Sequence, residues 1–297
     1  MDPAQSVQIV EVGPRDGLQN ESRILATDSK VAMVEALVRA GLKRIEIGSF
    51  VSAKQVAQMA DSAEVFRRLP KHPDVSYSAL VANQRGLDTA VRVGVREIAV
   101  FAAASETFSE KNIHCSIADS LVRYRDVAGQ ALGLGMRVRG YVSCVLGCPY
   151  EGHVRPESVA FVALNLFAMG CFEVSLGDTI GAGTPESTSK LLEILLQGDS
   201  PERFAVHFHD TGGRAMDNIE AALKFGIRVI DSSIGGLGGC PFAPGSPGNV
   251  ATERVASALH ARGFETGLDE AQLKAVAQLA ADMLGKSLVS STQADCE

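Results

Sequence analysis

The stretch Phe204-Ala205-Val206-His207-Phe208 is followed by a helix-like segment at residues 215–225 and by a second apolar run at residues 229–234. The two short runs are rich in β-branched and aromatic residues, which favour strands. The segment between them has the length of a helix. A strand, a helix and a further strand in this order predict one unit of a parallel α/β fold.

The same alternation runs along the rest of the chain. Strands are expected at residues 7–12, 44–48, 75–81, 97–101, 138–145, 173–176, 204–208 and 229–234. Helices are expected at residues 29–40, 61–69, 84–93, 117–134, 156–169, 185–196, 215–225, 252–262 and 269–284. About eight such units predict a (β/α)8 TIM barrel with an extra C-terminal helical segment. An open, doubly wound sheet is the alternative, but residues 13–17 lack the dinucleotide fingerprint that it would carry after its first strand.

The composition indicates a globular enzyme-sized protein. Residues 1–297 are expected to form one catalytic domain, with the barrel at about 7–265 and a helix and tail at about 266–297. The net charge of -7 argues against nucleic acid as a partner. No apolar run approaches the roughly 20 residues that span a bilayer, and the polar start has no signal segment, so a cytoplasmic protein without membrane contact is expected. The six scattered cysteines fit reduced thiols, and Cys144 and Cys148 have no second pair to complete a zinc site.

Polar side chains gather where the barrel mouth is expected, because the carboxyl ends of all strands point to one face. They are Arg15, Asp16, Glu46, Asp178, His207, His209, Cys240, Asn249 and Glu253. His207 and His209 stand two apart on a strand and therefore face the same side. With Asp16 and Asn249 they would suit a six-coordinate Mg²⁺ or Mn²⁺. A pair of hydrogen-bonded structural histidines is the alternative.

Arg15 at this mouth is expected to hold a carboxylate or to polarise a carbonyl group, although an ion pair with Asp16 at the surface is the alternative. Glu46 and Asp178 are expected to orient Arg15 or the histidines.

The segment Gly235-Gly236-Leu237-Gly238-Gly239-Cys240-Pro241 sets a thiol in a glycine-rich loop. This composition predicts a thiol that a lid brings to the site. The alternatives are a small buried cysteine and a dinucleotide loop, but the glycines lack the spacing for the second.

Several long motifs carry a resemblance that spans about residues 7 to 265. They are residues 10–21 (VEVGPRDGLQNE), Ile45-Glu46, residues 140–144 and 148–152, residues 176–181 (LGDTIG), residues 207–211 and the Cys240 loop. Together they resemble the 3-hydroxy-3-methylglutaryl-CoA lyase family.

The resemblance implies a (β/α)8 barrel that cleaves 3-hydroxy-3-methylglutaryl-CoA to acetyl-CoA and acetoacetate, in leucine breakdown and ketone-body formation. It also implies a divalent cation, Mg²⁺ or Mn²⁺, an acyl-CoA substrate and a homodimer. Carried across by position, the roles are metal ligands for Asp16, His207, His209 and Asn249; catalysis for Cys240, Arg15, Asp16 and Glu253; substrate binding for Arg15, Glu46 and Tyr141; and support from Asp178 and Glu46.

Three other functions stay open at this point. Gly212 and Phe242 depart from the family pattern, so a related 3-hydroxyacyl-CoA such as citramalyl-CoA is an alternative substrate. The related Claisen-type acyl-CoA synthases share the Arg-Asp and His-x-His elements, but the Cys240 loop favours a lyase. A non-catalytic barrel that binds CoA or a metal is disfavoured, because the acid–base and metal positions are all filled.

Overall fold

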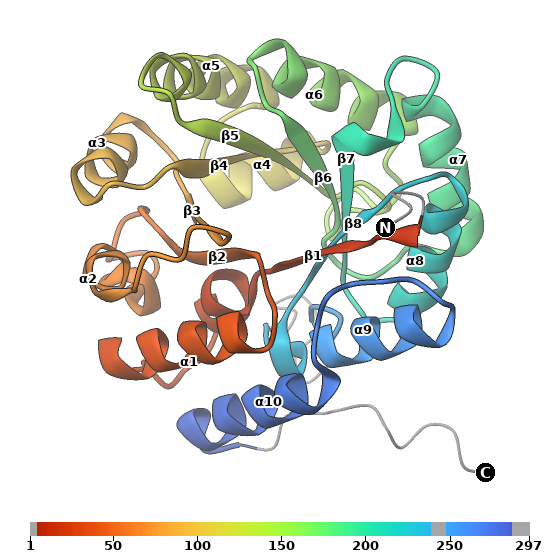
Figure 1. The fold of residues 1–297 in the computed structure, drawn as a ribbon. Coiled ribbons are helices and arrows are strands. Elements are labelled where there is room, and N and C mark those ends of the chain that lie inside the picture. Colours follow the sequence, from red (N-terminus) through yellow and green to blue (C-terminus); the bar gives the residue numbers. More distant parts are fainter. Residues whose placement is uncertain (1–4, 239–247, 287–297) are drawn as a thin grey trace.

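Eight parallel strands form a closed barrel in the computed structural model, which describes residues 5–238 and 248–286 (Figure 1). The strands are β1 (Gln8–Glu11), β2 (Arg44–Ser49), β3 (Ser76–Leu80), β4 (Glu97–Ala103), β5 (Arg137–Ser143), β6 (Glu173–Asp178), β7 (Phe204–Phe208) and β8 (Val229–Ser232). Each strand pairs with the next one, and β1 also pairs with β8, from Gln8 opposite Val229 to Glu11 opposite Ser232. The sheet therefore has no free edge.

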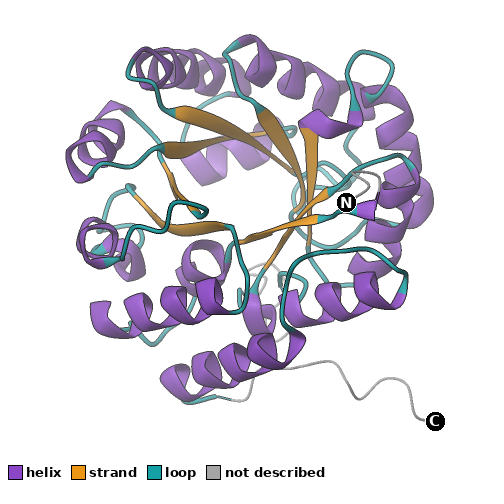
Figure 2. Ribbon diagram, viewed as in Figure 1, coloured by secondary structure: helices purple, strands orange, loops and turns teal. Residues whose placement is uncertain are grey.

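Helices form a ring outside the strands, as Figure 2 shows. They are α1 (Thr27–Arg39), α2 (Ser62–Arg68), α3 (Gln84–Val93), α4 (Glu106–Ile113), α5 (Ile117–Gly133), α6 (Pro156–Ala168), α7 (Pro185–Leu195), α8 (Ala215–Lys224), α9 (Thr252–Ala261) and α10 (Glu270–Leu284). Pro156 and Pro185 open α6 and α7, where the missing N–H costs nothing, and Thr184 caps α7 through a reciprocal hydrogen-bond pair with Ser187. The helices bury apolar residues on their inner sides, α10 doing so against α1 and α9.

The predicted barrel and its extra C-terminal helix are confirmed, since α10 packs against α1 and α9. One helix was not predicted. Ser105 caps α4 by accepting a hydrogen bond from Phe108 N (3.1 Å), and α4 follows β4 at the barrel mouth. Strand β4 also extends beyond the predicted residue 101, to Ala103.

The centre of the barrel is charged, in contrast to the apolar layer between strands and helices. Arg139 on β5 bonds to Glu173 on β6 (2.6 Å) and to Asp231 on β8 (2.7 Å), and Arg44 on β2 also bonds to Glu173 (2.9 Å). All four side chains are buried. Buried charges are costly unless they are paired, and these are paired across four strands.

Within the described ranges, no helix has the combined length and apolar character that crossing a membrane requires.

Candidate active site

A single π-helical turn, η2 (Gly13–Gly17), carries Arg15 and Asp16 at the end of β1. The carbonyl of Val12 accepts hydrogen bonds from the N–H groups of Arg15, Asp16 and Gly17. Gly13 and Gly17 are required by close packing: a Cβ at Gly13 would lie 2.5 Å from Glu11 Oε1, and one at Gly17 would lie 2.6 Å from Ser233 Oγ. The turn is therefore pressed against the barrel end, and it fixes the direction of both charged side chains.

Arg15 is buried and held by two carboxylates. Its Nε and Nη2 donate to Glu46 Oε2 at 3.1 and 2.9 Å, and its Nη1 donates to Asp16 Oδ1. Tyr141 OH donates to the same Glu46 oxygen (2.9 Å), and the guanidinium carbon of Arg15 lies 5.6 Å from the centre of the Tyr141 ring. Glu46 thus aligns Arg15 and Tyr141, and the guanidinium stays charged.

Asp16, His207 and His209 bring three potential ligand atoms within 4.8 Å of one another. His207 lies near the end of β7 and His209 one residue beyond it, and their ring centres are 5.5 Å apart. His207 Nε2 lies 3.7 Å from Asp16 Oδ2, and His209 Nδ1 is buried without a hydrogen-bond partner in the described structure. A buried imidazole nitrogen that no proton donor satisfies fits a metal ligand, so this donor set suits a divalent cation.

The charge states of these groups also suit a cation. Burial and the neighbouring His207 lower the pKa of His209 to about 4, so its ring is neutral at pH 7 and keeps its lone pair. Burial alone would raise the pKa of Asp16, but Arg15 and the two histidines outweigh it and hold that pKa well below its usual value. A carboxylate and neutral imidazoles are the forms that bind metals.

Asn249 joins this cluster, because its Nδ2 donates to Asp16 Oδ2 at 2.8 Å. It also pairs with His209 in an isolated bridge, which brings the chain after the glycine-rich segment back to β7. Its role as a fourth ligand stays a prediction. Cys240 lies outside the described residues.

Asp178 and Glu253 accept hydrogen bonds from backbone N–H groups rather than from the histidines. Asp178 accepts hydrogen bonds from Ala182 N (3.1 Å) and Gly183 N (2.8 Å), and burial raises its pKa to about 6. It shapes the loop after β6. Glu253 Oε2 accepts from Gly235 N (3.0 Å) and so holds the start of the glycine-rich segment.

Glu11 on β1 links two parts of the site and was not predicted from the sequence. Its Oε1 accepts hydrogen bonds from Gly13 N (2.8 Å) and Ile234 N (2.9 Å), and its Oε2 accepts from Thr252 Oγ1 (2.6 Å). One fully buried carboxyl group therefore anchors both the Arg15 turn and the short helix η5 (Ile234–Gly236) before the glycine-rich segment.

Replacing Glu11 with glutamine should change how stability depends on pH. Burial, with a smaller contribution from Glu253, raises the pKa of Glu11 from 4.5 to about 7. Between these values the folded protein keeps a proton that the unfolded chain has released, so this group's stabilising contribution falls as the pH rises towards 7. Between these two pKa values, the contribution of Glu11 to the free energy of unfolding changes by at most about 3 kcal/mol. Urea unfolding at about pH 5 and about pH 8 should show Glu11→Gln gaining stability relative to the parent at the higher pH; parallel curves would contradict this.

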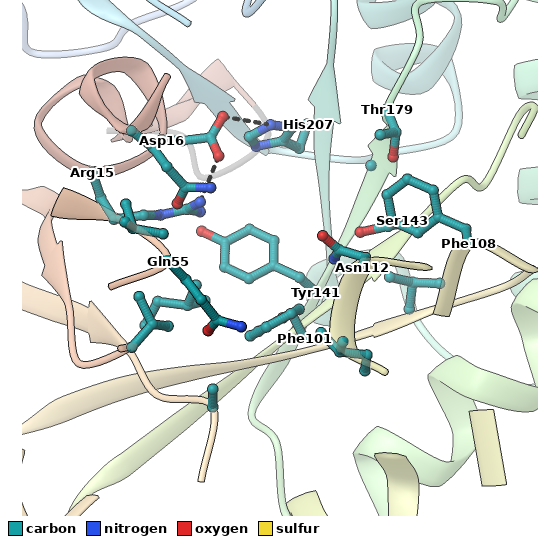
Figure 3. A pocket seen from close by; sticks show the side chains of 18 of the residues that line it. Arg15, Asp16, Gln55, Phe101, Phe108, Asn112, Tyr141, Ser143, Thr179 and His207 are labelled. Carbon is teal, nitrogen blue, oxygen red and sulfur yellow. Dashed lines mark hydrogen bonds and ion pairs between the residues drawn. The ribbon is translucent and has the colours of Figure 1, made fainter. Parts of the chain in front are cut away.

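The three potential ligands and Arg15 open into a pocket of about 580 Å³. In Figure 3, Tyr141 stands in the middle of the pocket with its hydroxyl toward Arg15, and Phe101 lies beside it. Apolar side chains also line the pocket, among them Leu80, Phe101 and Phe108. Phe108 belongs to α4, so the helix that sequence reasoning missed supplies part of this lining.

Asp231 and Arg139 were also missed. Both are charged residues inside predicted strands, at residues 229–234 and 138–145, and this is the signal that would have found them. A charged residue in the centre of a buried strand implies a partner inside the barrel.

Residues 6–280 match the HMGL-like family. The chain belongs to the HMGL-like family. Among its HMGL-like relatives, it is 53% identical to the hydroxymethylglutaryl-CoA lyase of Pseudomonas mevalonii, over 93% of this chain and 90% of that one. It is also 53% identical to a 3-hydroxy-3-isohexenylglutaryl-CoA/hydroxymethylglutaryl-CoA lyase of Pseudomonas aeruginosa, over 97% and 96% of the two chains.

A solved HMGL-like structure has the same fold. The crystal structure of hydroxymethylglutaryl-CoA lyase from Pseudomonas aeruginosa superposes with a TM-score of 0.95 at 53% identity, covering 97% of this chain and 96% of that chain. The resemblance inferred from the sequence motifs is thereby confirmed.

Proposed function

We propose that this chain is a lyase that cleaves 3-hydroxy-3-methylglutaryl-CoA to acetyl-CoA and acetoacetate. The observation that carries the proposal is the arrangement of Asp16, His207 and His209 beside the buried Arg15. The chain also belongs to the HMGL-like family, and a relative that is 53% identical to it is named hydroxymethylglutaryl-CoA lyase. The three potential ligands and the guanidinium line one pocket.

The reaction breaks the bond between the carbon that bears the hydroxyl group and the carbon next to the thioester. The hydroxyl proton leaves, its oxygen forms the ketone of acetoacetate, and the electron pair of the broken bond passes to the thioester as an enolate. Protonation of the enolate carbon then gives acetyl-CoA. The protein must therefore accept one proton, stabilise a negative charge and deliver one proton.

Asp16, His207 and His209, with Asn249, would hold a divalent cation, Mg²⁺ or Mn²⁺. When bound, the cation supplies Lewis acidity that favours loss of the hydroxyl proton. With the cation bound, the Nε2 lone pair of His207 would be occupied, which leaves the Asp16 carboxylate as the candidate acceptor of that proton.

Arg15 would stabilise the enolate. Its guanidinium is fixed by Glu46 and Asp16 before substrate binds, so its charge is already in position when the enolate forms. Tyr141 and Glu46 keep its direction. Pre-oriented charge of this kind acts without reorganisation during the reaction.

The test of the function is a turnover assay of the purified protein with Mg²⁺. The substrates are the CoA thioesters of 3-hydroxy-3-methylglutarate, 3-hydroxy-3-isohexenylglutarate and citramalate. We expect acetyl-CoA and acetoacetate from the first with the highest kcat/KM. A higher kcat/KM with another thioester would reassign the substrate, and condensation of acetyl-CoA without cleavage would favour a synthase.

Cys240 is proposed as the donor of the final proton, so an alkylating reagent should inactivate the enzyme by labelling it. Bound substrate should slow this labelling, and Cys240→Ser should keep Mn²⁺ binding while losing most turnover, because a hydroxyl is a much weaker acid than a thiol. Peptide mass mapping identifies the labelled thiol, with the half-buried Cys115 as internal comparison. Inactive protein labelled on Cys115 or Cys296 alone, or full turnover by Cys240→Ser, would reject this role.

Three finer assignments stay predictions of the sequence. They are the homodimer, the cytoplasmic location and the place in leucine breakdown and ketone-body formation.

A further inference from the structure

Asp231 lies on β8 inside the barrel, next to His207 of the proposed metal site. Its side chain is fully buried. Oδ2 accepts hydrogen bonds from Ser175 Oγ (2.8 Å) and Arg139 Nη1 (2.9 Å), and Oδ1 accepts from Arg139 Nη2 (2.7 Å). These three hydrogen bonds and a fourth contact, with His207, leave the carboxylate little freedom to rotate.

The fourth contact is with His207. Its Nδ1 lies 3.3 Å from Asp231 Oδ2, while its Nε2, on the other side of the ring, faces Asp16. A carboxylate held in place by Arg139 accepts hydrogen bonds and cannot donate one, so it selects the form of His207 that carries the proton on Nδ1. The lone pair of Nε2 then points towards Asp16.

Arg139 couples this contact to the other half of the site. The Nη1 atom that bonds to Asp231 also donates to Tyr141 OH (2.8 Å), and Tyr141 bonds to the Glu46 oxygen that holds Arg15. The ring of Tyr141 stands edge-on to that of His207, with centres 6.0 Å apart. The orientation of His207 is therefore built into the same framework as that of Arg15.

We propose that Asp231 is a positioning residue that fixes the tautomer and the ring orientation of His207, so that Nε2 is presented to a divalent cation. The proposal rests on the proposed metal site. It deepens that site by assigning the group that prepares one of its ligands, and Arg139 is the clamp that keeps this group ionised and immobile.

The variant that tests it is Asp231→Asn, which keeps the volume but cannot accept hydrogen bonds on both sides. The full-length protein is stripped of metal and titrated with Mn²⁺, and free Mn²⁺ is measured by electron paramagnetic resonance. We expect a loss of about 10- to 100-fold in Mn²⁺ affinity, the range typical of carboxylates that orient a histidine ligand. Since no substrate is present, a wrong substrate assignment would leave this result unchanged.

Glu173→Gln is the matched control. Glu173 is also buried and bonds to the same Arg139 (Nε, 2.6 Å), but its other partner is Arg44, at the opposite end of the charged network from His207. Its loss should lower stability and leave Mn²⁺ affinity within about threefold of the parent, because no histidine ligand loses its partner. Equal losses of affinity in both variants would show a general effect of the network and overturn the proposal, as would parent-like affinity in Asp231→Asn.

The tautomer of His207 can also be measured in the parent protein, so the proposal is testable even if a variant fails to fold. Long-range ¹H–¹⁵N correlation spectra of the metal-free protein distinguish the two neutral forms of each histidine. We expect the proton of His207 on Nδ1. A neutral His207 with its proton on Nε2 would overturn the proposal.

Discussion

Replacing Arg15 with glutamine should lower kcat by about 10³-fold, since removal of one pre-oriented donor to a developing oxyanion typically costs about 10²- to 10³-fold and here a full charge is lost as well. The side chain is held by Glu46 and Asp16, so its charge is in position when the enolate forms. Stopped-time assays of acetoacetate release over a range of substrate concentrations separate kcat from KM.

Two control variants separate the geometry of Arg15 from the general effect of positive charge in the pocket. Arg15→Lys keeps the charge but loses the forked geometry that spans Glu46 and Asp16, and it should fall between the parent and Arg15→Gln. Arg123→Gln removes a positive charge that lines the same pocket from α5, and it should change kcat by less than about tenfold. A near-normal kcat in Arg15→Gln with unchanged Mn²⁺ binding and thermal unfolding would assign Arg15 to structure alone.

Replacing His207 with alanine should abolish turnover and weaken Mn²⁺ binding by at least about 10²-fold, because it removes one of the three potential ligand atoms that lie within 4.8 Å. Asp16→Ala should behave in the same way. Mn²⁺ titration of the metal-stripped variants measures the first effect, and acetoacetate release with excess Mg²⁺ measures the second.

His260→Ala is the control for loss of an imidazole. His260 lies on α9 and bonds to Glu270 and Thr266 outside the site, so neither quantity should change. Turnover by metal-stripped His207→Ala at the parent rate would remove the basis of the proposed metal site.

The barrel was predictable because each strand is marked by its own residues. The ends of the eight apolar or β-branched runs lie within two residues of the observed strand ends, and the following segments have helical length. Helix α4 was missed because its eight residues, Glu106–Ile113, are too few and too polar to show a helical period. Its one local signal is the capping serine, Ser105.

The mouth residues were predictable for a different reason. Asp16 and His207 follow directly from the rule that strand ends converge, and the structure brings them together with His209. The partners of Asp178 and Glu253 were not predictable, because each bonds to backbone N–H groups of a loop whose path the sequence does not specify. The charge of Asp231 inside a predicted strand was a signal, but its partners Arg139 and His207 lie on other strands, and the sequence does not specify that pairing.

The carboxyl group of Glu11 has a consequence for attempts to redesign this enzyme. It holds the turn that carries Arg15 and Asp16 with one hydrogen bond and the entry to the glycine-rich segment with another. A substitution that shifts it moves both at once, so these two regions are not independent targets for directed evolution. New substrate preferences are better sought at the apolar side chains that line the pocket, Leu80, Phe101 and Phe108, which are not among the hydrogen-bond partners of Glu11.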